Sequence, residues 1–369
     1  MASSADVLIV GAGPAGIATA IAAAQQGLRA TVADARRPPL DKACGEGLLP
    51  EGVSALQDLG IRLDSSVAFP FAGLRFSDEA SSASGRITRG AAFGLRRSVL
   101  HDLLVRRAAQ LGISFHWGTH VSELTSTGAL LDGVHFPFRY LVGADGQKSV
   151  VRKWADLGAR SGRSARFGFR CHFAVAPWSE FVEVHWGERC QLYITPTGPA
   201  EICVALLTSD PRQRIELALQ QFPAVANRLR GAQRLTAELG SPTGLERPRH
   251  VARGRIALVG DASFTIDGIT GRGLSLAFQQ ALRLGEALAS ENLAQYQLAH
   301  RRIVQGTVRA ARLLLLLDRH AWLRRKALRT FAQSPALFTR LISSHASHPR
   351  TAPIGTSEIF GLGWQFLRA

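Results

Sequence analysis

Residues 6–34 read DVLIVGAGPAGIATAIAAAQQGLRATVAD, and this stretch decides the fold. Its apolar start has the composition of a buried strand and leads directly into a GxGxxG turn, Gly11-Ala12-Gly13-Pro14-Ala15-Gly16. The Ala-rich residues 17–26 predict a helix that ends at Gly27, and residues 28–33 predict a second strand before Asp34. This β–α–β pattern has the glycine spacing of a dinucleotide-binding turn, where N–H groups at the helix N-terminus attract phosphate. The alternative is a glycine-rich turn that binds no nucleotide.

Length and composition favour a globular protein of two domains. The chain has 369 residues, of which 46% are hydrophobic and 20% are charged. The cysteines show neither a CxxC pair nor metal-ligand spacing, so we expect a reduced, cytoplasmic protein without a metal site. We expect no signal peptide and no membrane-spanning helix, because the longest leucine run covers only residues 313–317.

The order of strand and helix patterns predicts two domains woven from one chain. Residues 97–110 form an amphipathic pattern typical of a helix, and a polar stretch at residues 80–85 predicts the tip of a hairpin. Residues 161–249 are rich in the alternation typical of strands. We therefore predict an α/β fold with a discontinuous Rossmann-type domain (1–60, 95–160 and 250–300), an interleaved β-sheet substrate domain (61–94 and 161–249) and a basic helical C-terminal region (301–369).

Two further glycine-rich motifs follow buried strand patterns later in the chain. Residues 140–152 read YLVGADGQKSVVR, in which Asp145 lies between two glycines. Residues 255–262 read RIALVGDA, and the loop DGITGRG at residues 267–273 then leads into a helix. Glycines beside an aspartate let a ligand approach the backbone, and a helix N-terminus attracts negative charge. Each motif alone also fits an ordinary strand-to-helix turn in which the aspartate caps the helix.

In this order the three motifs resemble those of the FAD-dependent oxidoreductases of the aromatic-hydroxylase (group A flavin monooxygenase) and geranylgeranyl-reductase superfamily. The resemblance covers residues 1–300 and implies FAD as a permanent cofactor. It implies that Asp261 contacts the ribityl chain, that Arg97 lies near the ribityl-phosphate region, and that Asp145 serves a loop shared by flavin and pyridine nucleotide. It also implies two groups of cofactor contacts: Gly11, Gly13, Ala15, Gly16, Asp34 and Arg36 at the ADP part, and Gly260, Gly271, Arg272 and Gly273 toward the flavin ring.

Departures from the family patterns narrow the function. The sequence Cys44-Gly45-Glu46-Gly47 is similar to the Cys-Gly loop of the geranylgeranyl-reductase-like members, whereas the WxWxIP motif of tryptophan halogenases is absent. No second GxGxxG unit is present for a pyridine nucleotide, so NAD(P)H would bind transiently or another carrier would supply electrons.

Five side chains are candidates for chemistry and substrate binding. Cys44 is a candidate thiol beside the flavin and Glu46 a candidate proton donor, although a packed cysteine and an exposed loop carboxylate are equally ordinary explanations. Trp186, Tyr193 and Pro196 lie on strand patterns of the substrate domain, and we expect them to line the substrate cavity.

The C-terminal region carries most of the excess positive charge. Residues 301–350 hold eleven Lys or Arg and one acid, and the whole chain has a net charge of +16. A solvated basic face is the default interpretation, and no motif supports nucleic-acid binding. Peripheral attachment to the inner membrane surface is the sharper hypothesis, since apolar and basic residues alternate at Leu314, Leu317, Trp322, Leu323 and Phe331 with Arg324, Arg325 and Lys326.

The sequence therefore predicts an FAD-dependent oxidoreductase that acts on a small, lipophilic molecule. Because the superfamily is richest in this activity, monooxygenation of a bulky apolar or aromatic, secondary-metabolite-like substrate ranks first. Reduction of an isoprenoid or polyketide double bond is the alternative, and a non-enzymatic flavin-binding redox sensor at a membrane surface ranks below both.

Overall fold

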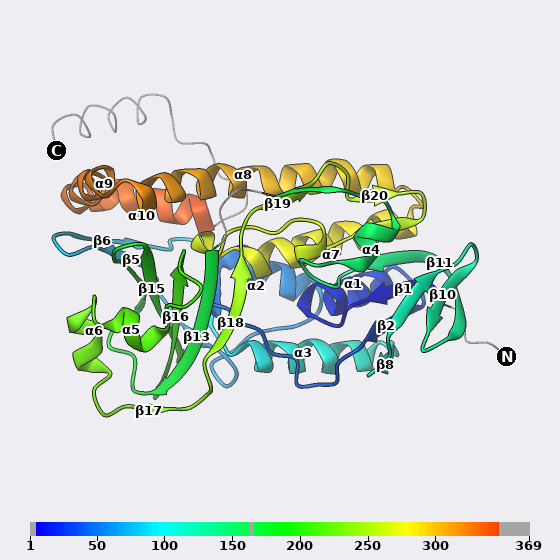
Figure 1. The fold of residues 1–369 in the computed structure, drawn as a ribbon, viewed down its shortest axis with the longest axis horizontal. Helices are drawn as coiled ribbons and strands as arrows, with labels where there is room; N and C mark the ends of the chain where they lie inside the picture. The colour runs from blue at the N-terminus through cyan, green and yellow to red at the C-terminus, as the bar shows by residue number, and fades with distance from the viewer. Residues whose placement is uncertain (1–4, 162–165, 347–369) are drawn as a thin grey trace.

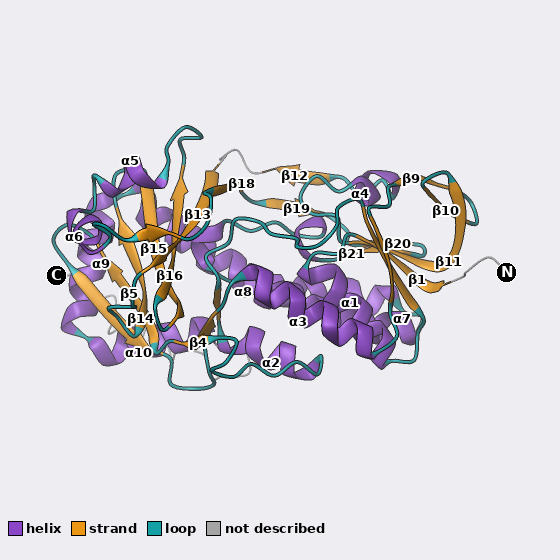
Figure 2. Ribbon diagram, turned by 90° about the horizontal axis from the view of Figure 1, so that it is seen from below, coloured by secondary structure: helices purple, strands orange, loops and turns teal. Residues whose placement is uncertain are grey.

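The computed structural model describes residues 5–161 and 166–346. Two large sheets lie toward opposite ends of the long axis, with helices between and beside them (Figures 1 and 2). The predicted mixed α/β fold and the helical C-terminal region are confirmed.

The first sheet has parallel strands at its centre. Its order is β20-β21-β11-β1-β2-β8, and β10 and β9 extend β11 as an antiparallel ribbon. The bounds are β1 (Ala5–Val10), β2 (Ala30–Asp34), β8 (Ser114–Trp117), β9 (Val121–Leu124), β10 (Gly128–Leu131), β11 (Val134–Gly143), β20 (Ala252–Arg253) and β21 (Ile256–Leu258). Segments far apart in the sequence are thus hydrogen-bonded neighbours here.

The second sheet is largely antiparallel. Its order is β17-β13-β16-β15-β14-β5-β6, and β18 also pairs with β13. The bounds are β5 (Gly73–Ser77), β6 (Ser82–Arg86), β13 (Arg166–Ala174), β14 (Phe181–Trp186), β15 (Cys190–Gly198), β16 (Glu201–Thr208), β17 (Gln233–Arg234) and β18 (Leu239–Thr243). The position expected for the hairpin tip, residues 80–85, is wrong. Residues 82–85 belong to β6 and pair with β5, and the turn lies at residues 78–81.

Helices cover both sheets, and smaller strands connect them. The helices are α1 (Pro14–Gln25), α2 (Pro50–Asp58), α3 (Arg97–Gln110), α4 (Val150–Trp154), α5 (Ile215–Leu219), α6 (Pro223–Arg228), α7 (Gly273–Ala289), α8 (Leu293–Arg319), α9 (Ala321–Gln333) and α10 (Pro335–Ala346). The smaller strands are β3 (Gly47–Leu48), β4 (Phe69–Pro70), β7 (Phe93–Gly94), β12 (Ala159–Ser161) and β19 (Glu246–Pro248), and two 3₁₀ turns are η1 (Gly260–Ala262) and η2 (Gly268–Thr270). None of the described helices is long and apolar enough to cross a membrane.

The two largest apolar cores among the described residues pack helices against the sheets. The larger one packs α1, α3 and α7 against the first sheet, and α1 lies directly against α7. The smaller one packs α5 and α6 against one face of the second sheet. The opposite face of that sheet remains available for a cavity, which α9 and α10 close beside β5 and β6.

Candidate active site

The three glycine-rich motifs meet at one edge of the first sheet. The Ala144 N–H donates to the Val10 carbonyl (2.8 Å), and the Val259 N–H donates to the Gly143 carbonyl (2.9 Å). Gly11 has a φ of 108°, and a Cβ on it would collide with the Ala144 carbonyl. Gly260 has a φ of 60°, and its Cβ would lie 2.6 Å from that of Ala15. Glycine is therefore required at both positions, and the ends of β1, β11 and β21 form a single site.

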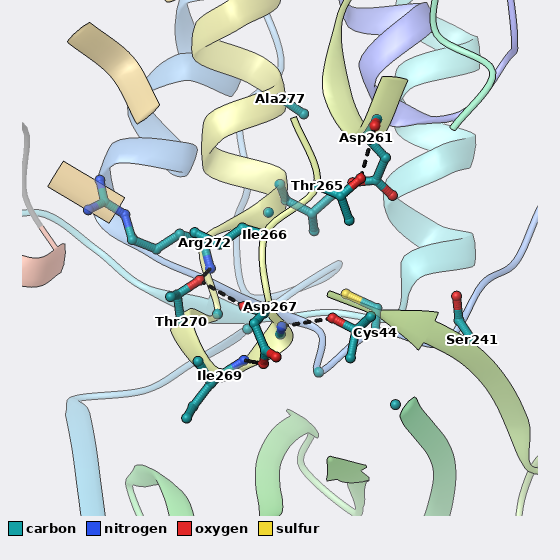
Figure 3. A pocket seen from close by; sticks show the side chains of 18 of the residues that line it. Cys44, Ser241, Asp261, Thr265, Ile266, Asp267, Ile269, Thr270, Arg272 and Ala277 are labelled. Atoms are coloured by element: carbon teal, nitrogen blue, oxygen red, sulfur yellow. Dashed lines mark hydrogen bonds between the residues drawn. The ribbon is translucent and has the colours of Figure 1, made fainter. Parts of the chain in front are cut away.

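A cavity of about 1420 Å³ starts at this edge and continues to the second sheet and the C-terminal helices. Figure 3 shows Cys44, Asp261, Thr265 and Asp267 arranged around part of it. The volume exceeds the 300–1,000 Å³ of ordinary small-ligand pockets, so it can hold a dinucleotide and a second molecule.

One end of the cavity fits the ADP part of a dinucleotide. The Asp34 carboxylate accepts hydrogen bonds from the Ala12 N–H (2.8 Å) and the Arg36 N–H (2.9 Å), and its position at the end of β2 suits ribose recognition. A Cβ on Gly13 would meet no atom within 4 Å, so the backbone there is open to a phosphate. The first turn of α1 adds N–H groups without intrahelical partners, which favour negative charge.

The middle of the cavity carries the aspartates of the second and third motifs. Asp261 lies 2.8 Å from the Lys42 ammonium, and both side chains are about 40% exposed. Asp145 caps α4 by accepting from the Val150 and Val151 N–H groups, but its buried Oδ1 has no partner among the described residues. An unpaired buried acceptor beside the cavity fits a bound ligand that donates a hydrogen bond. Arg97, at the start of α3, also lines the cavity.

The loop before α7 presents its backbone, and not the Arg272 guanidinium, to the cavity. Gly271 ends η2 in the left-handed conformation, and the Asp267 carboxylate accepts from the Ile269 N–H. The Arg272 side chain extends away from this loop (Figure 3). Its Nε donates to the Glu51 carboxylate on α2 over 2.7 Å. The Arg272 guanidinium is therefore engaged by Glu51, as a buried guanidinium requires a carboxylate partner, and a contact of its main chain with the flavin stays a prediction.

The loop that carries Cys44 is fixed to the second sheet. The Thr195 hydroxyl donates to the Gly45 carbonyl (2.8 Å), and the Cys203 thiol donates to the Cys44 carbonyl (3.8 Å). The Glu46 N–H donates to the Cys44 sulfur (3.4 Å), and Cys44 itself is half-buried and lines the cavity. The thiol is thus held in place and reachable from the cavity.

Glu46 is the centre of a buried network and not a free acid. Its carboxylate lies 2.6 Å from His172 Nε2 and accepts from the Arg97 N–H (3.0 Å). Arg170 lies 3.7 Å away and also binds Asp41 (2.6 Å). These contacts oppose the candidate role of Glu46 as a proton donor, because its oxygens are already engaged. They assign it to positioning the Cys44 loop.

Glu46, His172 and Cys203 also group their ligand atoms within 4.8 Å of one another. Three ligands of this kind could hold a metal ion. The Arg170 guanidinium beside Glu46 opposes a second cation there, so the group is better explained by the network above.

The second sheet supplies the apolar wall of the cavity. Trp186 and Tyr193 line it, and their contact with a substrate stays a prediction. The Tyr193 hydroxyl donates to Gln191 (2.8 Å). Pro196 does not line the cavity, so that expectation is wrong. It is paired with Ile202, whose side chain belongs to the core on the opposite face of the sheet. Because side chains alternate along β15, Thr195 points to the cavity instead. The two-residue spacing from Tyr193 could have identified Thr195.

The C-terminal helices form the remaining wall, which sequence reasoning missed. Leu314, Leu317 and Phe331 line the cavity, and Arg324 is buried beside Asp78 with its guanidinium over the Trp186 ring. The sequence-based hypothesis that these four side chains face a membrane is therefore wrong, because they line the cavity or are buried. Their periodicity is equally typical of a helix that packs against a protein core.

Comparison with known proteins decides the family. A model described as an FAD binding domain matches residues 4–298. The chain belongs to the FAD-binding family. It is an FAD-dependent oxidoreductase of the aromatic-hydroxylase-like superfamily, and FAD is its cofactor, as predicted.

Relatives of this flavoprotein include both reductases and monooxygenases. It is 28% identical to a menaquinone reductase of Mycolicibacterium smegmatis over 86% of this chain and 85% of the relative. It is 25% identical to a rifampicin monooxygenase of Rhodococcus hoagii over 78% of this chain and 64% of that protein. The structure of a p-nitrophenol 4-monooxygenase of Pseudomonas putida superposes with a TM-score of 0.81 at 16% identity, covering 95% and 100% of the two chains, which shows a shared fold.

We expect Asp261→Ala to lose FAD without unfolding. An exposed ion pair such as Asp261–Lys42 contributes at most about 1 kcal/mol to stability, whereas a lost hydrogen bond to a charged group weakens ligand binding by about tenfold to a hundredfold. Fluorescence titration of the apoprotein with FAD measures this. Asp102→Ala, which removes an exposed pair with Arg106, is the matched control. Unchanged FAD affinity in Asp261→Ala would remove this residue from the site.

We expect His345 to make the protein sensitive to mild acid. Its Nε2 lies 3.1 Å from the Thr270 carbonyl oxygen, and burial lowers its pKa from the ordinary 6.5 to about 4. Unfolding therefore takes up a proton between these values, and the free energy of unfolding falls by about 1.4 kcal/mol for each pH unit lost. Denaturant unfolding of His345→Gln between these pH values should show a shallower dependence than the parent. Equal slopes would contradict the assignment.

Proposed function

We propose that this flavoprotein reduces an isolated carbon–carbon double bond in a long apolar molecule of the isoprenoid type. The observation that carries the proposal is a half-buried thiol, Cys44, in a cavity whose far part is lined by apolar side chains. Similarity to a menaquinone reductase over most of both chains supports it.

The cavity suits a chain-like substrate. Beyond the flavin loop its lining is formed by Leu74, Phe76, Val184, Leu314, Leu328 and Ile342, contributed by both β-strands and C-terminal helices. Burial of such a chain is favourable in proportion to its apolar area, and water is excluded from the reacting carbons. The second sheet and the C-terminal helices thus act together as the substrate holder.

The chemistry divides between cofactor and protein. FAD, when bound, supplies a hydride donor, and in this family NAD(P)H commonly recharges it. The residues that would hold it are Asp34 and the start of α1 at the ADP end, Asp261 in the middle and the backbone of residues 271–273 at the ring. Saturation of a double bond also needs a proton on the second carbon. The Cys44 Sγ–H is a donor inside the cavity, and the Glu46 network keeps it in place.

Monooxygenation of a bulky aromatic molecule is the second candidate, and it ranks first on sequence alone. The aromatic side chains of Phe76, Trp186 and Tyr193 in the cavity and the similarity to a rifampicin monooxygenase favour it. An accessible thiol in an oxygen-activating site is exposed to oxidation, which is our reason for placing reduction first. The family is one of enzymes, so a non-catalytic redox sensor ranks last.

Anaerobic mixing distinguishes the two reactions. Protein reduced by light in the absence of oxygen is mixed with geranylgeraniol or a short isoprenoid quinone, and flavin absorbance and product mass are followed. Reoxidation together with a product that gains two hydrogen atoms supports the reductase. Substrate-stimulated oxygen uptake with NADPH in air, and a product that gains an oxygen atom, would replace it by the monooxygenase.

A further inference from the structure

The outer surface of α8 carries one continuous stripe. Spacings of four and three residues place its members on the same side of the helix, which extends over about 30 Å at 1.5 Å per residue. All of them are exposed, and they are Leu298, Arg302, Gln305, Arg309, Arg312, Leu316 and Arg319. An adjoining side of α8 is buried through Val304, Val308 and Ala311. We call this stripe, together with the adjoining Leu313 and the exposed Trp322, Arg325 and Arg329 of α9, which begins two residues after α8 ends, the outer basic face.

The charge of the outer basic face is one-sided. None of its arginines has an acidic partner within the described part of the chain. Asp318, the acid of α8, faces inward, where it accepts from Gln191 (2.8 Å) and lies 3.7 Å from Arg166. Unpaired arginines that no acid neutralises suit a polyanionic surface.

Large apolar side chains are exposed on this face of α8 and at the start of α9. Leu298, Leu313, Leu316 and Trp322 are 56%, 58%, 44% and 66% exposed. They account for half of the exposed large hydrophobic residues found in the described chain, and the others lie on separate elements. Apolar anchors among arginines, with a tryptophan at one end, are typical of a helix that lies in a membrane interface.

The outer basic face borders the substrate cavity. Arg302, Arg309 and Leu313 are exposed and also line the cavity at its rim. The neighbouring Leu314 and Leu317 continue the lining along the same helix. Figure 1 shows α8 and α9 along one side of the molecule, over both sheets. A molecule that leaves a bilayer at this face would therefore meet the apolar wall directly.

We propose that the outer basic face docks the protein on an anionic phospholipid bilayer. The arginines contact lipid phosphates, and Leu298, Leu313, Leu316 and Trp322 insert between the acyl chains. The proposal goes beyond the reaction proposed above. Its failure would leave that reaction untouched, because vesicle binding is measured without turnover.

The test uses the full chain loaded with FAD. Sedimentation with vesicles of phosphatidylcholine alone is compared with vesicles that contain about 30% phosphatidylglycerol, at about 0.05 M and about 0.5 M NaCl. We expect binding to the anionic vesicles at low salt only. Arg312→Gln combined with Arg319→Gln, which alters two exposed arginines outside the cavity lining, should weaken it about 25-fold, at roughly fivefold per arginine. Arg62→Gln combined with Arg230→Gln, both exposed and in loops outside α8 and α9, is the matched control and should bind as the parent does.

Tryptophan emission tests the inserted side chains. Brominated acyl chains should quench Trp322, and the quenching should be lost in Trp322→Phe but kept in Val134→Ser, which alters an exposed apolar residue of β11. Three results would overturn the proposal: equal binding to neutral vesicles, unchanged binding of the double arginine variant, or quenching that survives Trp322→Phe. Binding of a DNA duplex that displaces vesicles without any tryptophan quenching would assign the face to nucleic acid instead.

Discussion

Replacement of Cys44 by alanine should lower kcat for double-bond reduction by about 10²–10⁴-fold, the usual contribution of a positioned proton donor. The thiol is reachable from the cavity and held by the Glu46 N–H, and Asp267, an acid that also borders the cavity, is paired with Arg166 over 3.4 Å. FAD content should be unchanged, because Cys44 lies outside the residues assigned to the cofactor. Anaerobic single-turnover kinetics with product analysis measure the effect.

The Cys44→Ser variant distinguishes the acidity of the thiol from the space that the side chain fills. A hydroxyl is a far weaker acid than a thiol, so Cys44→Ser should be nearly as slow as Cys44→Ala although it fills almost the same volume. Cys190→Ser, a buried cysteine away from the cavity, serves as the matched control. If Cys44→Ala reduces the substrate at the parental rate, the proton comes from another group and the proposed role of the thiol is wrong.

Replacement of His172 by alanine should cost about 3–5 kcal/mol of unfolding free energy, because it leaves the Glu46 carboxylate buried without its strongest partner. The effect should extend to the active site, because the Cys44 loop loses one of its two attachments to β13 and keeps only that through Arg170. We therefore expect kcat to fall even at temperatures where the variant is folded. Denaturant unfolding gives the first quantity and anaerobic turnover the second.

Two variants keep this prediction specific. His172→Gln can still donate to Glu46 and should recover part of both losses. Arg86→Ala breaks an exposed pair with Glu180 and should change stability by at most about 1 kcal/mol. If the His172→Ala protein is as stable as the Arg86→Ala protein, the contact between His172 and Glu46 does not stabilise the fold.

Local patterns in the sequence predicted much of the backbone. The helix expected at residues 97–110 is α3 with the same bounds, and the strand alternation noted over residues 161–249 includes β13 to β18. These elements follow from periodicity, which each segment carries by itself. The tight turns of the three motifs were also predictable from their glycines, because such a turn restricts the residue type directly.

Side-chain partners were beyond local patterns. Nothing near Arg272 in the sequence points to Glu51, more than two hundred residues away, and nothing near Glu46 points to His172. The sequence showed that the C-terminal helices carry an apolar stripe. It did not show whether that stripe faces a protein cavity or a membrane. The division into domains at the stated boundaries and the individual roles of the cofactor-binding residues stay predictions.

The order of strands in the first sheet has a consequence for biosynthesis. β1 and β2 are made first, yet β21 and the α7 helix that packs on α1 come from residues 256–289. At about 5–20 residues per second, the roughly 220 residues between β2 and β21 take about ten to forty seconds to synthesise. During that interval the nascent sheet has an open edge and an uncovered helix, which are the features that chaperones recognise and that aggregation exploits. Expression of this flavoprotein should therefore depend more on translation speed and chaperone supply than its final stability would suggest.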